Sequence, residues 1–212
     1  MKRKITCYCD NVFEIEAPEE IDLDNGEYID QILDGTFFNF TCPGCSKLHK
    51  PEFPLSALWP SKKLRFEVFP ELERGDFYRR KKAPDEKGPS KLETIIGYPE
   101  LAYRLAVIRG GFEPAAVEAI KYFLHLKAEE QYPDDEMEIW YYGYEGDSAN
   151  GSLQFHIHGI RKDEVAVMKV PLSLYQKTLD DYKKHPKGDT FSALRVRTYL
   201  SVKNTLRPEE LK

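Results

Sequence analysis

The sequence predicts an α+β fold: a small zinc-ribbon-like β unit with one helix, followed by a mainly antiparallel sheet with helices packed on one face. Short β-favouring runs bounded by Pro, Gly and Asp fill most of the first 70 residues. The clearest helical periodicity lies in a separate block further along the chain. All four cysteines fall within the first 45 residues, where a metal would compensate for a small core.

Three parts follow along the 212 residues: a unit over 1–72, a charged linker or long loop over 73–98, and an α+β domain over 99–212. The linker is predicted because charges of both signs crowd together between Glu73 and Thr94, and Pro84, Gly88 and Pro89 interrupt the run.

The first unit is predicted to hold several strands and one helix. The helix covers 25–33, with Tyr28, Ile29, Ile32 and Leu33 at helical spacing, and it stops at Gly35. The strands are placed by β-branched and aromatic enrichment at 2–6, 12–17, 36–41, 49–53 and 64–69.

The second half begins with two predicted helices, 99–108 and 114–130, separated by Gly110 and Gly111 and each with proline near its start. A further helix is predicted over 172–183, ending before Pro186. Strands of the antiparallel sheet are predicted at 137–144, 152–160, 164–170 and 194–200.

The cysteines occur as two close pairs, Cys7-x-Cys9 and Cys42-x-x-Cys45, separated by 32 residues. Each pair follows a β-favouring run and precedes turn formers, which is typical of a zinc ribbon, where two turns each present two thiolates to one tetrahedral ion. Pro43 and Gly44 suit such a turn, whose backbone N–H groups can hydrogen-bond the thiolates. We therefore expect Cys7, Cys9, Cys42 and Cys45 to be the ligands of one structural zinc ion.

Three other interpretations of the cysteines stay open at this point. Disulfides are disfavoured if the protein is cytoplasmic. A thiol-disulfide redox site is a stronger alternative, because Cys42-Pro43-Gly44-Cys45 has dithiol spacing, but the segment 46–51 is too short for the helix that such chemistry favours. The cysteines could also be buried without any ligand.

The sequence resembles the CpXC domain proteins, an uncharacterised bacterial and archaeal family named for two Cys-Pro-x-Cys motifs. The matching residues include Thr6-Cys7-Tyr8-Cys9 with 12–16, then 34–45 with both Cys42 and Cys45. Similarity continues through 53–55 and 64–70, and more weakly over 99–121. The resemblance implies metal binding by the cysteines and no particular activity.

One feature departs from the family pattern: the first motif has one residue between its cysteines instead of two. A Cys-x-Cys pair can chelate a metal but cannot form the usual knuckle turn. Asp10 and His49 are therefore candidate substitute ligands, should Cys7 or Cys9 be lost from the site.

The net charge of −5 is concentrated at the N-terminal end. Residues 1–72 carry 8 Lys and Arg against 13 Asp and Glu, whereas the other 140 residues carry 23 of each sign. An acidic unit repels phosphate backbones, which argues against nucleic-acid binding. The basic tetrad 79–82 is weak evidence for nucleic acid on an acidic protein, and we interpret it as part of a solvated loop.

Two histidines in the predicted strand 152–160, His156 and His158, point to the same face and could share a metal with a carboxylate, although the sequence names no third ligand. No phosphate-binding loop, nucleophile elbow or metalloprotease helix is present. We therefore expect a non-enzymatic binding or adaptor protein whose partner is another protein.

No run of about 18 apolar residues occurs in the sequence, and its first residues contain no apolar signal segment. We accordingly expect a cytoplasmic protein with no membrane partner. The oligomeric state and the pathway are not indicated by the sequence.

Overall fold

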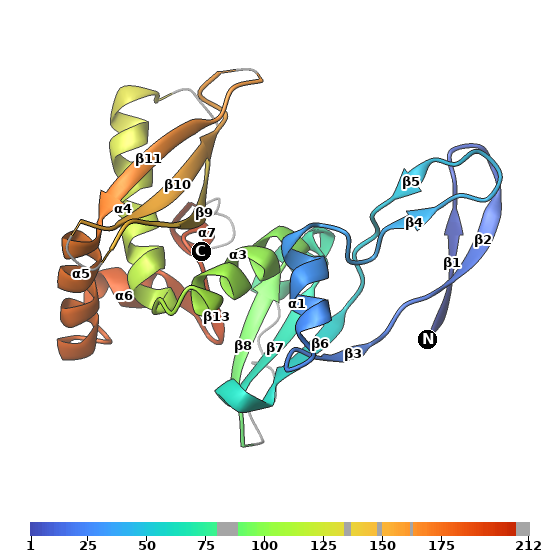
Figure 1. Cartoon of the computed structure of the whole chain (residues 1–212), viewed down its shortest axis with the longest axis horizontal. Helices are drawn as coiled ribbons and strands as arrows, with labels where there is room; N and C mark the ends of the chain where they lie inside the picture. The colour runs from blue at the N-terminus through green and yellow to red at the C-terminus, as the bar shows by residue number, and fades with distance from the viewer. Residues whose placement is uncertain (80–88, 134–136, 148–149, 162, 207–212) are drawn as a thin grey trace. The chain divides into compact units, whose positions relative to one another are not determined.

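The computed structural model describes residues 1–79, 89–133, 137–147, 150–161 and 163–206, and Figure 1 shows the arrangement of its helices and strands. The chain folds into two compact units, Met1–Ala102 and Tyr103–Lys212. Helices and mainly antiparallel strands occur in both, which confirms the α+β class. The predicted boundaries at 72 and 98 stay predictions.

Two β-hairpins project from the first unit (Figure 1). β1 (Lys2–Thr6) pairs antiparallel with β2 (Val12–Glu16), as the sequence predicts. β4 (Phe40–Thr41) pairs antiparallel with β5 (Leu48–His49). Each hairpin is two-stranded, a form that is at best marginally stable in water without further support.

The larger sheet of the first unit has the strand order β8-β7-β6-β3. β6 (Leu55–Trp59) and β7 (Leu64–Phe69) are antiparallel, whereas β3 (Glu20–Asp22) runs parallel to β6 and β8 (Lys91–Ile96) parallel to β7. Buried apolar residues of these strands form the core of the unit: Ile21, Leu55, Ala57, Trp59, Phe66, Val68, Ile95 and Ile96.

Helix α1 (Gly26–Leu33) confirms the predicted helix between the cysteine pairs. Its N-cap is Asn25, whose side-chain oxygen accepts a hydrogen bond from the Glu27 N–H at 3.3 Å. After the single-turn helices η1 (Pro60–Lys62) and η2 (Glu71–Glu73) comes α2 (Arg74–Arg79). Arg74 ties this region to the sheet, because its guanidinium donates to the Ile96 carbonyl at 3.1 Å.

The structure differs from the sequence prediction over 36–41, where only the last two residues are a strand. Phe37 and Phe38 are buried, and their rings stack with centroids 4.2 Å apart. Phe38 adopts a left-handed φ of 58°, which a strand does not allow. Burial of the aromatic rings therefore outweighs the β propensity of this run.

Helix α2 and strand β8 lie inside the segment 73–98 that we predicted as a linker or loop. β8 is short and almost entirely buried, and only its first residue is exposed. Such a fully buried strand has no polar–apolar alternation, and the neighbouring charges conceal it in the sequence.

Helix α3 (Tyr98–Arg109) contains the boundary between the units and is followed by α4 (Pro114–Gln131). Both confirm the predicted helices. α4 starts with Pro at its first position and with a side-chain cap, in which Glu113 accepts a hydrogen bond from the Ala115 N–H at 3.4 Å.

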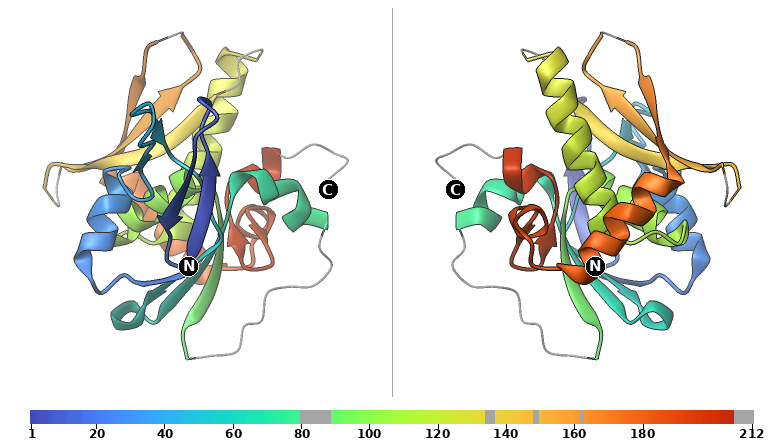
Figure 2. Two further views of the ribbon diagram at one scale, coloured as in Figure 1. Left: turned by 90° about the vertical axis from the view of Figure 1, so that its right-hand side faces the viewer. Right: turned by 90° about the vertical axis from the view of Figure 1, so that its left-hand side faces the viewer.

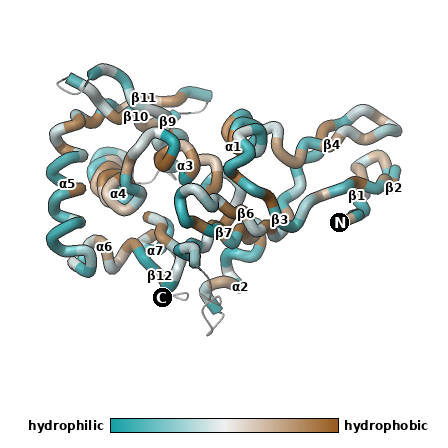
Figure 3. Tube along the Cα trace, turned by 60° about the horizontal axis from the view of Figure 1, so that its bottom comes forward, coloured by the Kyte–Doolittle hydropathy of each residue, from teal (hydrophilic) through white to brown (hydrophobic). Residues whose placement is uncertain are grey.

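The second unit is built on an antiparallel sheet of three strands in the order β11-β10-β9, and helices cover one of its faces (Figure 2). The strands β9 (Glu138–Glu145), β10 (Ser152–His158) and β11 (Ala166–Pro171) lie close to their predicted positions. Figure 3 shows hydrophobic and hydrophilic residues mixed along α4 and mostly hydrophilic ones along α5 (Leu172–Lys184). The core between sheet and helices includes Val117, Ile120, Leu124, Ile139, Leu153, Phe155, Ile157 and Tyr175.

The strand predicted over 194–200 is instead two short strands, β12 (Arg195–Val196) and β13 (Tyr199–Leu200). Arg197 between them has a φ of 57°, so the chain turns back there. Two short helices, α6 (Asp189–Ala193) and α7 (Lys203–Leu206), flank them.

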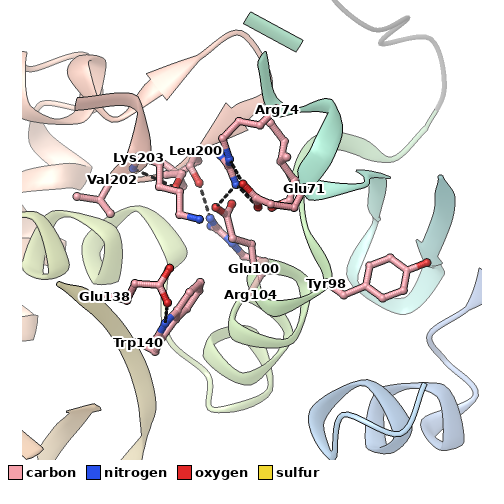
Figure 4. Close-up of polar contacts among 12 residues, drawn as sticks. Glu71, Arg74, Tyr98, Glu100, Arg104, Glu138, Trp140, Leu200, Val202 and Lys203 are labelled. Carbon is pink, nitrogen blue, oxygen red and sulfur yellow. Dashed lines mark hydrogen bonds and ion pairs between the residues drawn. The ribbon is translucent and has the colours of Figure 1, made fainter. Parts of the chain in front are cut away.

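A buried ionic pair of the second unit anchors this C-terminal segment. The Arg104 guanidinium donates to the Leu200 carbonyl at 2.7 Å (Figure 4). The Val202 N–H donates to the Glu118 carboxylate at 2.8 Å. The two charged groups lie 3.9 Å apart and are both buried.

Candidate metal centre

The four cysteines of the chain converge at the tips of the two hairpins. One sulfur each from Cys7, Cys9, Cys42 and Cys45 lies within 4.8 Å of every other. Among the described residues, no other group of three or more His, Cys, Asp or Glu ligand atoms lies this close together. The predicted convergence of two distant cysteine pairs is therefore confirmed.

The sulfur spacing fits a tetrahedral metal ion. Cys7 Sγ and Cys45 Sγ are 3.5 Å apart, and Cys9 Sγ and Cys42 Sγ are 3.8 Å apart. Four sulfurs at about 2.3 Å from a central zinc ion would be separated by about 3.8 Å along each tetrahedral edge. All four are free thiols, and their spacing is far longer than a disulfide bond of about 2.05 Å.

The first pair sits in the turn that joins β1 to β2. The Asp10 N–H donates to the Cys7 carbonyl at 3.0 Å, and the Cys7 N–H donates to the Asn11 carbonyl at 2.9 Å. Asp10 takes a left-handed φ of 63°, a conformation that Asp tolerates better than most residues. This tight turn lets a Cys-x-Cys pair present both sulfurs to one point without the usual knuckle.

The second pair sits in the turn that joins β4 to β5. The Ser46 N–H donates to the Cys42 carbonyl at 2.9 Å, and the Gly44 N–H donates to Cys42 Sγ at 3.4 Å. A β-carbon on Gly44 would lie 3.3 Å from the Asn11 side chain, so glycine suits the close contact between the two turns. This arrangement is the predicted turn, in which backbone N–H groups face a thiolate.

The environment of the sulfurs separates their pKa values. Burial raises the pKa of Cys42, but hydrogen bonds from the Asn11 side chain and from the Gly44 and Cys45 N–H groups outweigh it and lower the pKa to about 6. For Cys7, a backbone hydrogen bond from Cys9 lowers the pKa, whereas burial and the neighbouring thiols raise it to about 12. The lowered pKa favours the thiolate form of Cys42, and the raised pKa favours the protonated form of Cys7.

Two groups outside the cysteine set contact the sulfurs. The Asn11 side-chain amide donates to Cys42 Sγ at 3.5 Å, and His49 Nε2 hydrogen-bonds Cys7 Sγ at 3.2 Å. His49, one of the two predicted substitute ligands, thus lies beside the cluster. Neither His49 nor Asp10, the other one, belongs to the group of converging ligand atoms. Sequence reasoning missed Asn11, whose only signal was its place two residues after Cys9.

No helix directly follows the second cysteine pair. After Ser46, at a φ of 60°, the chain enters β5. The lowered pKa of Cys42 consequently comes from hydrogen bonds and not from the helix N-terminus that the thiol redox interpretation requires.

None of the other sequence features that we considered belongs to the cysteine cluster. The His156 ring stacks on Tyr142 with a centroid distance of 3.9 Å, and the rings of His156 and His158 are 6.5 Å apart. Of the basic tetrad, Arg79 ends α2 and its other three members, 80–82, lie outside the described residues. Among the described helices, none is long and apolar enough to cross a membrane.

Comparison with known proteins gives the family of the chain. A family model described as CpXC protein matches residues 5–121, which include all four cysteines. An uncharacterized protein of Treponema pallidum (strain Nichols) is 29% identical over 214 residues, covering 95% of this chain and 97% of that protein. No solved structure shows a significant match. The chain therefore belongs to the CpXC protein family.

Proposed function

We propose that Cys7, Cys9, Cys42 and Cys45 bind one structural zinc ion and that the protein is a non-enzymatic binding or adaptor protein. The observation that carries the proposal is the convergence of four unbonded sulfurs at distances close to a tetrahedral edge. Four thiolates saturate a zinc ion and leave no open position for a substrate, which favours a structural role over catalysis.

The hairpins need such a support because they bury little. The alternate residues Lys2, Lys4 and Thr6 of β1 are exposed, and β4 and β5 have two residues each. A structural zinc site contributes on the order of 10 kcal/mol to folding, which is comparable to the whole stability of a small domain. Zinc would therefore hold the two hairpins together.

Exposed apolar side chains near the cluster support another protein as the partner. Tyr8 is 85% exposed, Val12 55% and Leu48 49%, and all three lie in the hairpins or their turns. A contiguous exposed apolar patch marks an interaction surface, and a protein partner would cover these side chains. The acidic balance of residues 1–72 makes nucleic acid a poor partner. A cytoplasmic location, where thiols stay reduced, is part of the proposal.

Metal analysis of the purified protein tests the zinc site. Protein prepared without oxygen or chelators is expected to contain about one tightly bound zinc per chain. Cys42→Ser and Cys45→Ser are expected to remove most of it, whereas Thr41→Ser, next to Cys42 on an exposed position, is the matched control and retains it. Protein without near-stoichiometric metal, or Cys variants that keep it, would contradict the proposal.

A second candidate, thiol-disulfide exchange by Cys42 and Cys45, is favoured by one observation: the pKa of Cys42 is lowered to about 6. A low thiol pKa serves a nucleophile as well as a metal ligand. The two functions separate in zinc-loaded protein, because a saturated thiolate site protects Cys42 from alkylation. Rapid alkylation of Cys42 with zinc still bound would favour the redox candidate.

A further inference from the structure

A cavity of 590 Å³ in the second unit is lined by two histidines and two glutamates. They are His125, Glu129, Glu138 and His158, and they come from one helix and two strands. The cavity is distinct from the cysteine cluster, all of whose members belong to the first unit.

Helix α4 contributes one pair of these residues. His125 and Glu129 are four residues apart, so they lie on the same side of the helix with their β-carbons about 5–6 Å apart. His125 is 7% exposed, whereas Glu129 is exposed. The helix thus supplies a buried imidazole and a more accessible carboxylate.

The sheet contributes the other pair. Glu138 at the start of β9 lies directly opposite His158 at the end of β10 in the antiparallel register. Directly opposed residues have their β-carbons about 4.5–5.5 Å apart. The Glu138 carboxylate also accepts a hydrogen bond from the Trp140 indole N–H at 3.4 Å (Figure 4). Both side chains are exposed at the cavity.

The chemistry of these four groups is that of a transition-metal site. Imidazole nitrogens and carboxylate oxygens together suit Zn²⁺, Mn²⁺, Fe²⁺ and Co²⁺. Burial, with the nearby positive charge of Lys121, lowers the pKa of His125 to about 4. Its ring is therefore neutral at pH 7 and has a lone pair available to a metal.

We propose that His125, Glu129, Glu138 and His158 form a second metal site, which binds one divalent transition-metal ion. In the structure, only the cysteines among the described residues bring three or more ligand atoms within 4.8 Å. Binding therefore includes rotation of the exposed Glu129, Glu138 and His158 side chains toward the buried His125. The cavity is much larger than an ion, so it leaves room for water or a small ligand on the metal.

Titration of the reduced, metal-free full-length protein with Co²⁺ tests this site. Cobalt bound by thiolates gives an intense near-ultraviolet charge-transfer band, whereas cobalt bound by imidazole and carboxylate does not. The wild type is expected to bind two equivalents, one with the thiolate band and one without it. His158→Ala and Glu138→Gln are each expected to weaken the second equivalent at least about tenfold.

His156→Ala is the matched control, because His156 lies two residues earlier on the same strand, stacks on Tyr142 and does not line the cavity. It is expected to bind both equivalents as the wild type does. The variants replace exposed or half-exposed side chains, and an unchanged circular dichroism spectrum checks that they fold.

Three results would overturn the second site: a single cobalt equivalent that carries the thiolate band, a second equivalent unaffected by His158→Ala and Glu138→Gln, or equal weakening by His156→Ala. The proposal stands apart from the structural zinc site. Loss of the thiolate band with retention of one band-free equivalent would sink the zinc proposal and leave this one intact.

Discussion

Asn11 shows how a single polar side chain can prepare the cysteine cluster. Its amide reaches from the first hairpin to Cys42 Sγ in the second, and it is one cause of the lowered pKa of Cys42. Donors of this kind orient metal ligands and stabilise their charged form. The interaction thus couples two turns that are about thirty residues apart in the sequence.

We predict that Asn11→Ala raises the pKa of Cys42 in the metal-free protein and weakens zinc binding about tenfold, because the thiolate loses a hydrogen-bond donor. The rate of Cys42 alkylation as a function of pH measures the first effect, and competition with a chelator measures the second. Asn39→Ala is the control, since Asn39 donates to the Gly35 carbonyl and to no sulfur. Equal behaviour of the two variants would contradict the role of Asn11.

The raised thiol pKa values predict how zinc affinity changes with pH. The pKa of Cys7 is about 12 and that of Cys45 is also raised, so both thiols hold protons near neutrality and must release them to the metal. Affinity therefore rises with pH, by at least about 100-fold per pH unit for two protons. Chelator competition at pH 6.5 and 7.5 checks this, and an affinity unchanged between them would contradict it.

At the scale of the elements, β10 is the middle strand of the sheet in the second unit and contributes residues to its hydrophobic core. Leu153 and Phe155 are both completely buried between the sheet and its covering helices. On the neighbouring strand β11, Val167 is 55% exposed. The same sheet thus contains a position where packing should determine the effect of a substitution on stability, Phe155, and a position where it should not, Val167.

Phe155→Ala is expected to lower the free energy of unfolding by about 3–5 kcal/mol, because it removes a large side chain and leaves a cavity. Val167→Ala is the control and is expected to change it by no more than about 0.5 kcal/mol. Urea unfolding followed by circular dichroism measures both. A decrease in the free energy of unfolding of less than about 1 kcal/mol for Phe155→Ala would show that the core around Phe155 is less tightly packed than in the structure.

Elements with strong periodicity or clear caps were predictable from the sequence. Helices α1, α4 and α5 are examples of such elements. The β1–β2 hairpin was also predictable, because two β-favouring runs flank a turn. β6 was missed because its five residues lie between Pro54 and Pro60, which suggest a loop. β8 was missed because a buried parallel strand beside a charged run has no distinguishing period.

The cysteines of the candidate metal centre could be predicted from the sequence, but the other residues that contact their sulfurs could not. The spacing of the two pairs predicts that Cys7, Cys9, Cys42 and Cys45 converge, because two close cysteine pairs are typical of a site that holds one metal ion. The contacts of Asn11 and His49 depend on how one hairpin lies against the other, which no local pattern encodes. The cavity around His125 likewise depends on the packing of α4 on β9 and β10. The sequence therefore suggested His158 as a possible metal ligand but did not identify the residues that line the cavity with it.

At the scale of the whole molecule, the two units have different sources of stability. The second unit has extensive apolar cores of its own, whereas the hairpins of the first have short strands that bury little and meet at the cysteine cluster. Removing the metal is therefore expected to affect the chain unevenly.

Hydrogen exchange before and after zinc removal tests this difference. We expect chelation to increase exchange strongly in the two hairpins, over 2–16 and 40–49, and to leave α4 and β10 protected. Re-addition of zinc is the control and should restore the original pattern. Uniform loss of protection across both units would show that the zinc site stabilises the whole chain.

X-ray absorption at the zinc edge tests the central claim most directly. In His158→Ala protein holding one zinc per chain, we predict four sulfur neighbours of the zinc at about 2.3 Å and no directly bound nitrogen or oxygen. A first shell with fewer than three sulfurs, or one dominated by nitrogen and oxygen, would contradict it.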